Sequence, residues 1–413
     1  MRRVAVTGFG VVSPVGIGRE AFWSALAAGA SGIGRITRFD PSTFAVQLAG
    51  EVRGRLELPK AVDEIAGRDP KVGFAFAAAA EALASAGNPR LGVKSLLHLG
   101  TSLETFDLDA LVFDERRDFR SIVEGERPLQ VSLDTAGELI RRYFRDMAIN
   151  GSGPFILTNV SACAASAQAI GHGFHAVRSG ETELALCGGF DSMVNPLGVG
   201  GFQLLGALST ENDRGESGCR PFDASRSGAV LGEGAAMLVL EPLEKARAEG
   251  RTVLAEVSGC GSTLDAHGLS APDPEGRGAE RAMRAALADA GIAPEAVGHV
   301  NAHGTGTRLN DEVEAAAIRR VFAASWQRLP VSATKSLTGH LIGAAGAVEA
   351  GACLLALVKG LLPPNPWLRK VAPGCELDHV VGTNARAFDG EYALSNSFGF
   401  GGQNASLVFR RVR

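Results

Sequence analysis

The pattern of apolar and polar positions predicts alternating strands and helices along this 413-residue chain. Residues Val4–Pro14 are mostly apolar and β-branched and end in a glycine turn, which is typical of a buried strand. Apolar residues recur at helical spacing over residues 71–86. We therefore expect a helix there, with Asp69 as its N-cap and Gly87 as its end.

A second amphipathic helix is expected after Asp134, which is also an N-cap residue type. Its apolar face would contain Leu139, Tyr143 and Met147, with several arginines turned elsewhere. The preceding segment, residues 101–125, is polar and charged. We expect that segment to be an excursion on the surface.

Residues 159–171 are the segment around which we expect the functional site to be organised. A strand-like approach ends near Val160, and the small residues that follow predict a tightly packed helix, which Gly180 would end. Cys163 stands at the joint between the strand and the helix. The apolar run Leu184–Cys187 then predicts a buried strand.

The two halves of the chain contain short similar strings in the same order. The pairs are Val6–Gly10 with Val257–Gly261, Val160–Cys163 with Val331–Thr334, and Gly232–Val239 with Gly401–Val408. Their common order indicates a duplication. We therefore expect two βαβ-type halves around a mostly parallel sheet, with residues 1–250 carrying the cysteine and residues 251–413 the other chemistry.

Composition limits the classes of protein to which the chain can belong. With 46% hydrophobic and 21% charged residues and a net charge of −4, it resembles ordinary globular proteins rather than disordered or fibrous ones. The acidic balance disfavours nucleic-acid and anionic-membrane partners, and no run approaches the roughly 20 apolar residues of a membrane span. The six cysteines show no short paired spacing, which predicts reduced thiols and a cytoplasmic location.

Cys163 is the candidate nucleophile because it stands at the start of a predicted helix. The unpaired N–H groups and the positive end of the helix dipole are expected to lower the thiol pKa from about 8.5 toward neutrality. The alternative is a buried cysteine that packs as a small apolar side chain, as most free cysteines do. This stretch alone does not decide between them.

The second half contributes further candidate groups in three glycine-rich strings, Val300–Asp311, Ser332–His340 and Ser395–Asn404. His303 follows a predicted buried strand, and a structural histidine is the alternative reading of it. Lys335 and His340 lie five residues apart in a loop before a small-residue helix expected over residues 343–351. The third string is expected to be a strand that ends in an aromatic turn.

Other chemistries fit these residues less well. His172 and His175 are three residues apart, but no further cysteine or carboxylate completes a plausible four-ligand metal set. The chain has neither a phosphate-binding Gly-x-x-x-x-Gly-Lys-Ser/Thr string nor the Gly-x-Ser-x-Gly elbow of a serine hydrolase. A cysteine with two histidines and a lysine remains, and this set suits acyl transfer through a thioester.

Several strings together resemble the β-ketoacyl-acyl-carrier-protein synthases of the type I/II elongating class, and synthase II in particular. They are the strings around Cys163, His303, Lys335, His340 and Phe400, with Leu197–Phe202, Arg220–Asp223 and Gly232–Gly234. The similarity runs from Val4 to Phe409. The resemblance implies an α/β architecture, namely the duplicated thiolase fold in five αβαβα layers, and a homodimer.

The resemblance also implies the catalytic roles. Cys163 would take an acyl chain from a carrier-protein thioester. His303 and His340 would donate hydrogen bonds to the malonyl thioester carbonyl and so stabilise the enolate formed when carbon dioxide leaves. The backbone N–H groups of Cys163 and Phe400 would form the oxyanion hole.

The remaining matched residues would support this centre. Lys335 would assist the histidines electrostatically, Glu314 and Glu349 would hold that network, and Phe400 would swing as a gate. Thr305 and Thr307 would bind the phosphopantetheine arm, which belongs to the carrier protein, so that the chain needs no cofactor or metal of its own. The resemblance thus implies four substrate-binding positions, which are Thr305, Thr307, Phe202 and Gly401.

The chain departs from the family's usual pattern at four places. Leu103–Phe106 lacks the usual glycines, and the usual proline-rich segment before the helix at Asp134 is absent, which leaves the chain-length preference open. Ala162–Ser166 differs from the strings of housekeeping enzymes, which favours a specialised paralogue. Gly206 replaces a frequent arginine that meets the acidic carrier protein, which leaves the docking surface open. Other basic groups must then attract the carrier protein, and the candidates are Arg68, Lys71, Arg116, Arg117, Arg120 and Arg127.

Three functions from different classes stay open at this point. The first is an elongating condensing enzyme of fatty-acid or type II polyketide or polyene synthesis, as a homodimer or as one subunit of a heterodimer. The second is a thiolase or starter synthase, which would need a second catalytic cysteine or a Cys-His-Asn set. The third is a chain-length factor, which would lack the nucleophile that Cys163 provides.

Overall fold

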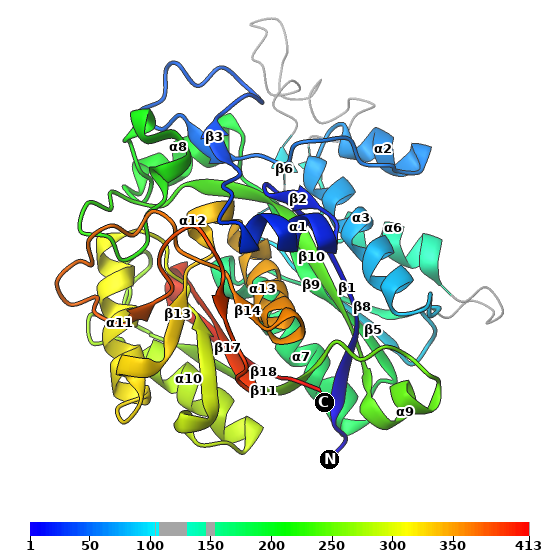
Figure 1. Ribbon diagram of the computed structural model, residues 1–413. Helices are drawn as coiled ribbons and strands as arrows, with labels where there is room; N and C mark the ends of the chain where they lie inside the picture. Colours follow the sequence, from blue (N-terminus) through cyan, green and yellow to red (C-terminus); the bar gives the residue numbers. More distant parts are fainter. Residues whose placement is uncertain (104, 107–129, 146–152, 413) are drawn as a thin grey trace, which may run out of the picture.

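The two halves of the protein repeat one order of strands and helices (Figure 1). The computed structural model describes residues 1–103, 105–106, 130–145 and 153–412. The first half contains β1 (Val4–Ser13), α3 (Pro70–Ser85), β5 (Ser95–Gly100), α6 (Thr135–Phe144), β8 (Phe155–Asn159), α7 (Ala165–Ser179), β9 (Leu184–Ser192) and β10 (Leu231–Pro242). The second contains β11 (Ala255–Leu264), α10 (Arg277–Ala290), β12 (Val297–Asn301), α11 (Arg308–Val321), β13 (Pro330–Ser332), α13 (Ala345–Lys359), β17 (Tyr392–Gly399) and β18 (Gln403–Arg410).

Shorter elements connect and cover these strands and helices. In the first half they are β2 (Gly16–Ile17), α1 (Arg19–Ala27), β3 (Ile33–Arg35), β4 (Leu48–Gly50), α2 (Lys60–Ala66), β6 (Thr105–Phe106), β7 (Gln130–Val131), the 3₁₀ helix η1 (Ala162–Ala164), α8 (Pro196–Leu204), η2 (Asn212–Gly218) and α9 (Leu243–Ala248). In the second they are η3 (Pro294–Ala296), η4 (Trp326–Arg328), α12 (Lys335–Thr338), η5 (Ile342–Ala344), β14 (Leu361–Leu362), β15 (Asp378–His379), β16 (Arg386–Ala387) and η6 (Phe400–Gly402).

The two repeated halves of the chain meet at the centre of the sheet. β1 and β11 pair antiparallel, with Val4 opposite Val257, and the strand order outward is β10-β9-β5-β8 on one side and β18-β17-β12-β13 on the other. β9, β5 and β8 are parallel, as are β17, β12 and β13, but β10 and β18 run antiparallel to both neighbours. The expectation of a mostly parallel sheet was therefore wrong, because β17 and β18, for example, form a hairpin across η6.

Helices and strands stack as the five expected layers. α3 packs on the outer face of β1, β10 and β9, and α10 packs on β11 and β18. Between these strand layers lie α7 and α13, which contact each other and strands of both halves (Figure 1). The division between residues 250 and 251 falls in the turn between α9 and β11, and its status as a domain boundary stays a prediction.

The middle layer is apolar because it is enclosed on both sides. Among the described residues, one helical stretch, Ile342–Lys359, has the length and composition of a membrane span, but 89% of it is buried inside the protein. It consists of η5 and α13, and α13 extends the helix predicted over residues 343–351. Its composition follows from its place in the core.

The predicted helices form, but their caps and faces differ in detail. α3 ends just before Gly87, whose φ of 80° stops the helix as expected. Asp69 precedes α3 without a capping hydrogen bond among the described contacts, and its carboxylate lies 3.6 Å from the Lys71 ammonium instead. In α6 Leu139 is buried as predicted, whereas Tyr143 is 37% exposed because Ile140, not Tyr143, shares the buried face.

Two predictions fall on residues that the structure does not describe. Met147 and most of the surface excursion expected at residues 101–125 lie outside the described residues.

Gly351 of α13 allows the helix to approach β1. A Cβ at this position would lie 2.1 Å from Cζ of the Phe9 ring, which is fully buried. We expect Gly351→Ala to lower the free energy of unfolding by roughly 1–3 kcal/mol through overpacking, measured by urea denaturation. The control is Gly201→Ala in α8, where nothing lies within 4 Å of an added Cβ; equal losses in both variants would contradict the packing argument.

Candidate active site

Cys163 lies where the first half turns from a strand into a helix. It belongs to η1, between β8 and α7, and is 2% exposed. Ala162 adopts a φ of 48°, an unusual conformation for a residue with a side chain. Gly399 makes room for the nucleophile, because a Cβ there would lie 2.9 Å from the Cys163 nitrogen. The predicted position of Cys163 at the joint is confirmed.

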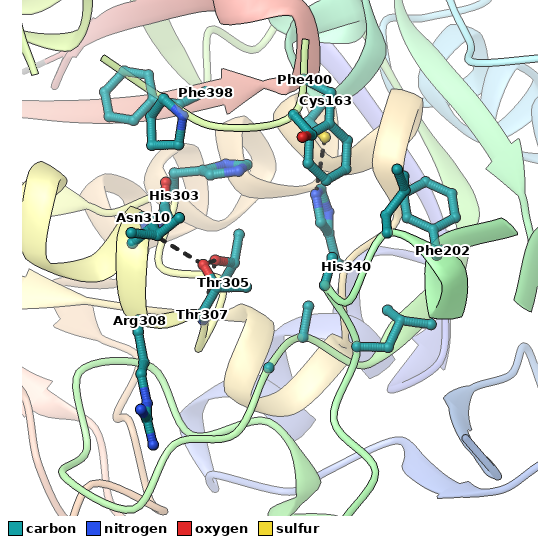
Figure 2. Close-up of a pocket in the computed structure, with 18 of the residues that line it drawn as sticks. Cys163, Phe202, His303, Thr305, Thr307, Arg308, Asn310, His340, Phe398 and Phe400 are labelled. Carbon is teal, nitrogen blue, oxygen red and sulfur yellow. Dashed lines mark hydrogen bonds between the residues drawn. The ribbon is translucent and has the colours of Figure 1, made fainter. Parts of the chain in front are cut away.

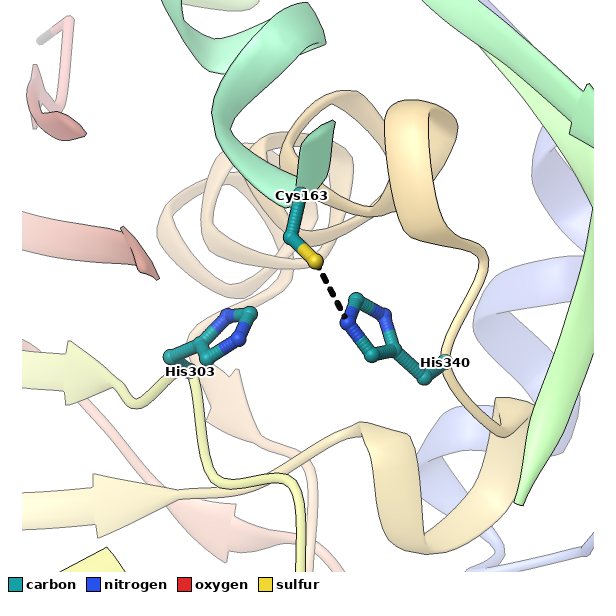
Figure 3. Close-up of side chains that lie close together, drawn as sticks. All are labelled: Cys163, His303 and His340. Atoms are coloured by element: carbon teal, nitrogen blue, oxygen red, sulfur yellow. Dashed lines mark hydrogen bonds between the residues drawn. The ribbon is translucent and has the colours of Figure 1, made fainter. Parts of the chain in front are cut away.

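His340 points its Nε2 atom at the nucleophile (Figure 3). The distance from Nε2 to the Cys163 Sγ atom is 3.0 Å, and Nδ1 accepts a hydrogen bond from the Ile342 N–H at 3.2 Å. A neutral imidazole whose Nδ1 accepts must carry its proton on Nε2. His340 is therefore oriented as an N–H donor toward the sulfur.

His303 is fixed as a second donor of the same kind. Its Nδ1 lies 3.1 Å from the Lys335 ammonium, which also donates to the His303 carbonyl at 2.6 Å. Because an ammonium has only donors, Nδ1 accepts and the ring proton lies on Nε2. The two rings are nearly perpendicular, at 84°, with centroids 5.2 Å apart.

Two buried glutamates hold this arrangement from behind. The Glu349 carboxylate pairs with the Lys335 ammonium, so neither charge is left alone in the core. Glu314 accepts hydrogen bonds from the N–H groups of His303 and Gly304, both at 2.8 Å, and from the Asn396 side chain at 3.1 Å. Their contacts fit the supporting roles that the resemblance implied.

Burial favours the uncharged forms of the three central side chains. It raises the pKa of the Cys163 thiol to about 12, against the opposing effects of the Lys335 charge and the Phe400 N–H. Burial and the Lys335 charge hold the pKa of His303 and of His340 well below 6.5. The pKa lowering expected from the helix start alone was therefore wrong, because desolvation outweighs it.

The same three side chains have the spacing of a metal site. The ligand atoms of Cys163, His303 and His340 lie within 4.8 Å of one another. A metal needs an unprotonated imidazole nitrogen, however, and here the accepting Nδ1 atoms leave protons on both Nε2 atoms. The pair considered from the sequence separates: His172 contacts His98, with the two Nδ1 atoms 2.9 Å apart, and His175 contacts Arg178.

A pocket of about 670 Å³ leads from the surface to Cys163 (Figure 2). Phe202 of α8 and Phe400 of η6 line it, with ring centroids 6.0 Å apart. Thr305 and Thr307 lie on another wall, with their hydroxyl oxygens 2.9 Å apart. The predicted residues that line the pocket are Cys163, Phe202, His303, Thr305, Thr307, His340, Phe400 and Gly401.

Comparison with known proteins decides the family. The model of the β-ketoacyl synthase N-terminal domain matches residues 1–246, and that of the C-terminal domain matches residues 254–368. The chain belongs to the β-ketoacyl synthase family. It is 39% identical over 421 residues to the 3-oxoacyl-[acyl-carrier-protein] synthase 2 of Coxiella burnetii, covering 100% of this chain and 99% of the relative.

Other members of the family are similar along their whole length. The 3-oxoacyl-[acyl-carrier-protein] synthase 2 of Synechocystis is 38% identical over 419 residues, covering 100% of this chain and 99% of the relative. A β-ketoacyl synthase from Burkholderia phymatum and the structure titled the ishigamide ketosynthase/chain length factor each superpose with a TM-score of 0.86 at 34% identity, over 100% of both chains. The fold is accordingly the thiolase fold expected from the sequence.

The structure changes the set of basic residues that could meet a carrier protein. Lys71 is 2% exposed and paired with Asp69, so its assignment to a docking surface was wrong. Arg68 is half-buried, and the four candidates between residues 116 and 127 lie outside the described residues. Arg308, which was not singled out, is exposed at the mouth of the pocket (Figure 2).

Sequence reasoning also missed a buried acid of this β-ketoacyl synthase. Asp191, near the end of β9, is fully buried and accepts a hydrogen bond from the Gly343 N–H of η5 at 2.7 Å. Its signal in the sequence was an acidic residue four positions after the predicted apolar strand Leu184–Cys187.

Proposed function

We propose that this chain is a 3-oxoacyl-acyl-carrier-protein synthase that extends an acyl chain by two carbons through decarboxylative Claisen condensation. One observation carries the proposal: a buried cysteine at the end of a pocket is faced by two neutral imidazoles that both present Nε2–H donors. Such donors suit a reaction in which negative charge develops on thioester oxygens.

In the first step the Cys163 sulfur attacks the carbonyl of an acyl thioester. The Cys163 and Phe400 N–H groups stabilise the oxyanion of the tetrahedral intermediate, and the His340 Nε2–H stabilises the sulfur as it loses its proton. Collapse of the intermediate leaves the acyl group on Cys163, and the proton lost by the Cys163 thiol ends on the departing carrier-protein sulfur. Because burial raises the pKa of the Cys163 thiol, the resting form is the thiol, and the His340 Nε2–H stabilises the sulfur only as it reacts.

In the second step malonyl thioester enters the same pocket. Its C–C bond to the carboxylate breaks, carbon dioxide leaves, and the electron pair forms an enolate whose oxygen accepts hydrogen bonds from the Nε2–H groups of His303 and His340. The enolate carbon attacks the acyl carbonyl on Cys163, and expulsion of the sulfur gives the 3-oxoacyl thioester. One proton is taken up to restore the thiol.

Phe400, the threonines and the partner complete the proposal. Phe400 acts as a gate that its glycine neighbours allow to move, and Gly401 with a φ of 74° supports that motion. Thr305, Thr307 and Phe202 contact the phosphopantetheine arm, which an acyl-carrier protein brings, so the enzyme has no cofactor or metal of its own. An enzyme that draws on carrier-protein thioesters fits a cytoplasmic location.

We further propose a homodimer formed at the edge of the sheet. Among the strands that the structure describes, β8 is the last on its side of the sheet, and Phe155 at its start and Val160 just after it are 65% and 50% exposed. Pairing of two β8 strands would cover them. The second candidate is a ketosynthase subunit of a specialised type II polyketide heterodimer, which is favoured by the likeness to the ishigamide ketosynthase/chain length factor structure.

The test is reconstitution with a purified acyl-carrier protein. The chain alone, supplied with acyl- and malonyl-carrier protein, should form the 3-oxoacyl product, detected on the carrier protein by mass spectrometry, with release of carbon dioxide. Activity of the chain alone supports the homodimer. No product without a second, non-identical subunit would favour the heterodimer, and no decarboxylation or acylation under any condition would contradict the proposed function.

Arg308 is expected to assist docking of the acidic carrier protein. Exposed ion pairs are worth about 0.2–1 kcal/mol, so Arg308→Ala should lower kcat/KM for carrier-protein substrates by up to about fivefold, with a smaller loss at high salt. Small thioester mimics should show no change. The control is Arg386→Ala, an exposed arginine paired with Asp378; an equal loss with both kinds of substrate would contradict the docking role.

A further inference from the structure

Ile342 carries backbone strain next to the catalytic histidine. Its φ is 46°, which is rare and costly for a β-branched residue and persists where surrounding contacts hold it. The N–H group of this residue is the one that contacts Nδ1 of His340, at 3.2 Å. The proton position on His340 therefore depends on a strained segment of backbone.

The group that holds this segment is the carboxylate of Asp191. One oxygen accepts the N–H of Gly343, the residue after Ile342, at 2.7 Å. The other accepts from the Ser192 N–H and the Ser102 hydroxyl, both at 2.9 Å, so the carboxylate is itself fixed on β9. Asp191, which does not line the pocket, thus joins η5 to β9.

Gly343 packs closely against both the end of β5 and the Asp191 carboxylate. A Cβ at Gly343 would lie 2.5 Å from the Thr101 carbonyl carbon and 2.8 Å from the Asp191 Oδ2 atom. A side chain at position 343 would therefore displace either the strand end or the carboxylate. The equivalent turn of the first half, Ala162 with a φ of 48°, presents Cys163 at the position of Gly343.

A buried cation supports the charge on Asp191. Lys71 of α3 is 2% exposed, and its ammonium opposes the effect of burial, which raises the pKa of Asp191 to about 6. Lys71 also donates a hydrogen bond to the Leu103 carbonyl and lies 3.6 Å from Asp69. The Lys71 charge and the three hydrogen bonds that Asp191 accepts all favour its ionised form.

We propose that Asp191 is a positioning residue for His340. By holding the Gly343 N–H, it fixes the strained Ile342 backbone, whose own N–H keeps Nδ1 of His340 as an acceptor and so directs the Nε2–H donor into the pocket. This inference rests on the proposed function, because that donor is assigned to the malonyl thioester carbonyl.

The first measurement needs no substrate and is independent of the proposed function. Protein labelled with ¹⁵N-histidine reports by NMR which nitrogen of His340 carries the proton, with His340→Gln used for assignment. Wild type should show the Nε2–H form alone, and Asp191→Ala should show a mixture of both tautomers. The matched control is Glu241→Ala, which removes another buried acid of the same sheet that accepts from the Thr7 hydroxyl.

The second measurement compares two partial reactions of the same enzyme. Loss of a hydrogen bond to a charged group corresponds to roughly 10–100-fold, so malonyl decarboxylation per folded Asp191→Ala enzyme should fall by about that factor. Acylation of Cys163 should slow as well, because the same Nε2–H contacts the sulfur. In Glu241→Ala both reactions should scale together with the folded fraction. If the wild-type enzyme does not decarboxylate malonyl-carrier protein, the proposed function is wrong. The His340 tautomers measured by NMR in wild type and Asp191→Ala would still test the positioning role.

A second variant covers the case in which Asp191→Ala does not fold. Asp191→Asn keeps the volume but leaves one accepting oxygen for two backbone N–H groups, and a smaller change in the same direction is expected. If the folded variant retains the wild-type His340 tautomer and the wild-type rate of malonyl decarboxylation per folded enzyme, the proposal is overturned.

Discussion

Replacing Cys163 with alanine is expected to abolish condensation, by more than about 10⁴-fold, while malonyl decarboxylation continues. The acyl group then has no site of attachment, because Cys163 is the cysteine that lines the described pocket. The Nε2–H donors of His303 and His340 remain in place, since neither depends on the sulfur for its tautomer. Product formation and carbon dioxide release, measured in the same assay, test both halves of this expectation.

Cys187 supplies the matched control for that experiment. It lies fully buried in β9, and burial raises its pKa to about 12, as it does for Cys163. Because Cys187 lies outside the pocket lining, Cys187→Ala should still form an acyl-enzyme with the acyl group on the Cys163 peptide. If peptide mass spectrometry instead finds the acyl group on Cys187 or Cys353, the assignment of Cys163 as the nucleophile is wrong.

The sequence pointed to Cys163 as the nucleophile, but the pKa argument behind that prediction was wrong. Burial raises the pKa of Cys163 and of Cys187 alike to about 12, so the thiol pKa does not distinguish the two residues. A helix start was expected to lower the thiol pKa, but in the structure desolvation raises it against the opposing effects of the Lys335 charge and the Phe400 N–H. What distinguishes Cys163 from Cys187 is its access to the pocket and its contact with His340 at 3.0 Å. Both are tertiary features, which a local pattern of residues does not contain.

The internal repeat was found in the sequence, but one of its three pairs had the wrong register. The pairing of β1 with β11 confirms the first pair, and β10 and β18 occupy equivalent places beside them. Cys163 had been aligned with Thr334, whereas the shared positive φ of Ala162 and Ile342 makes Gly343 its structural equivalent. A short Val-Ser-Ala string is too common to fix the register of a repeat, whereas the backbone conformation fixes it.

Buried charges were the least predictable part of the site. Lys71 looked like a surface residue because it stands in the first turn of a helix, yet it is buried with Asp69 at 3.6 Å and supports Asp191. Asp191 lies on β9 and Lys71 on α3, and these two elements are far apart in sequence. By contrast, Lys335 and Glu349 were identified because their family motifs place them in known positions.

Removing either catalytic histidine is expected to lower malonyl decarboxylation by about 10²–10³-fold, the usual effect of losing one preorganised donor to a developing oxyanion. Acylation should respond unequally. His340 contacts the Cys163 sulfur, so His340→Ala should also slow acylation, whereas His303→Ala should leave acylation closer to wild type. Single-turnover acylation and carbon dioxide release measure the two steps separately.

A donor can be distinguished from a proton-accepting base by substitution and by pH. Glutamine places an N–H group near the position of Nε2, so His303→Gln and His340→Gln should recover part of the decarboxylation that the alanine variants lose. A general base would gain nothing from that amide. Because the pKa values of both histidines lie well below 6.5, they stay neutral as pH falls to that value, and decarboxylation should be flat between about pH 6.5 and 8. A rate that rises through this range, together with inactive glutamine variants, would assign the histidines to base catalysis and contradict the donor role.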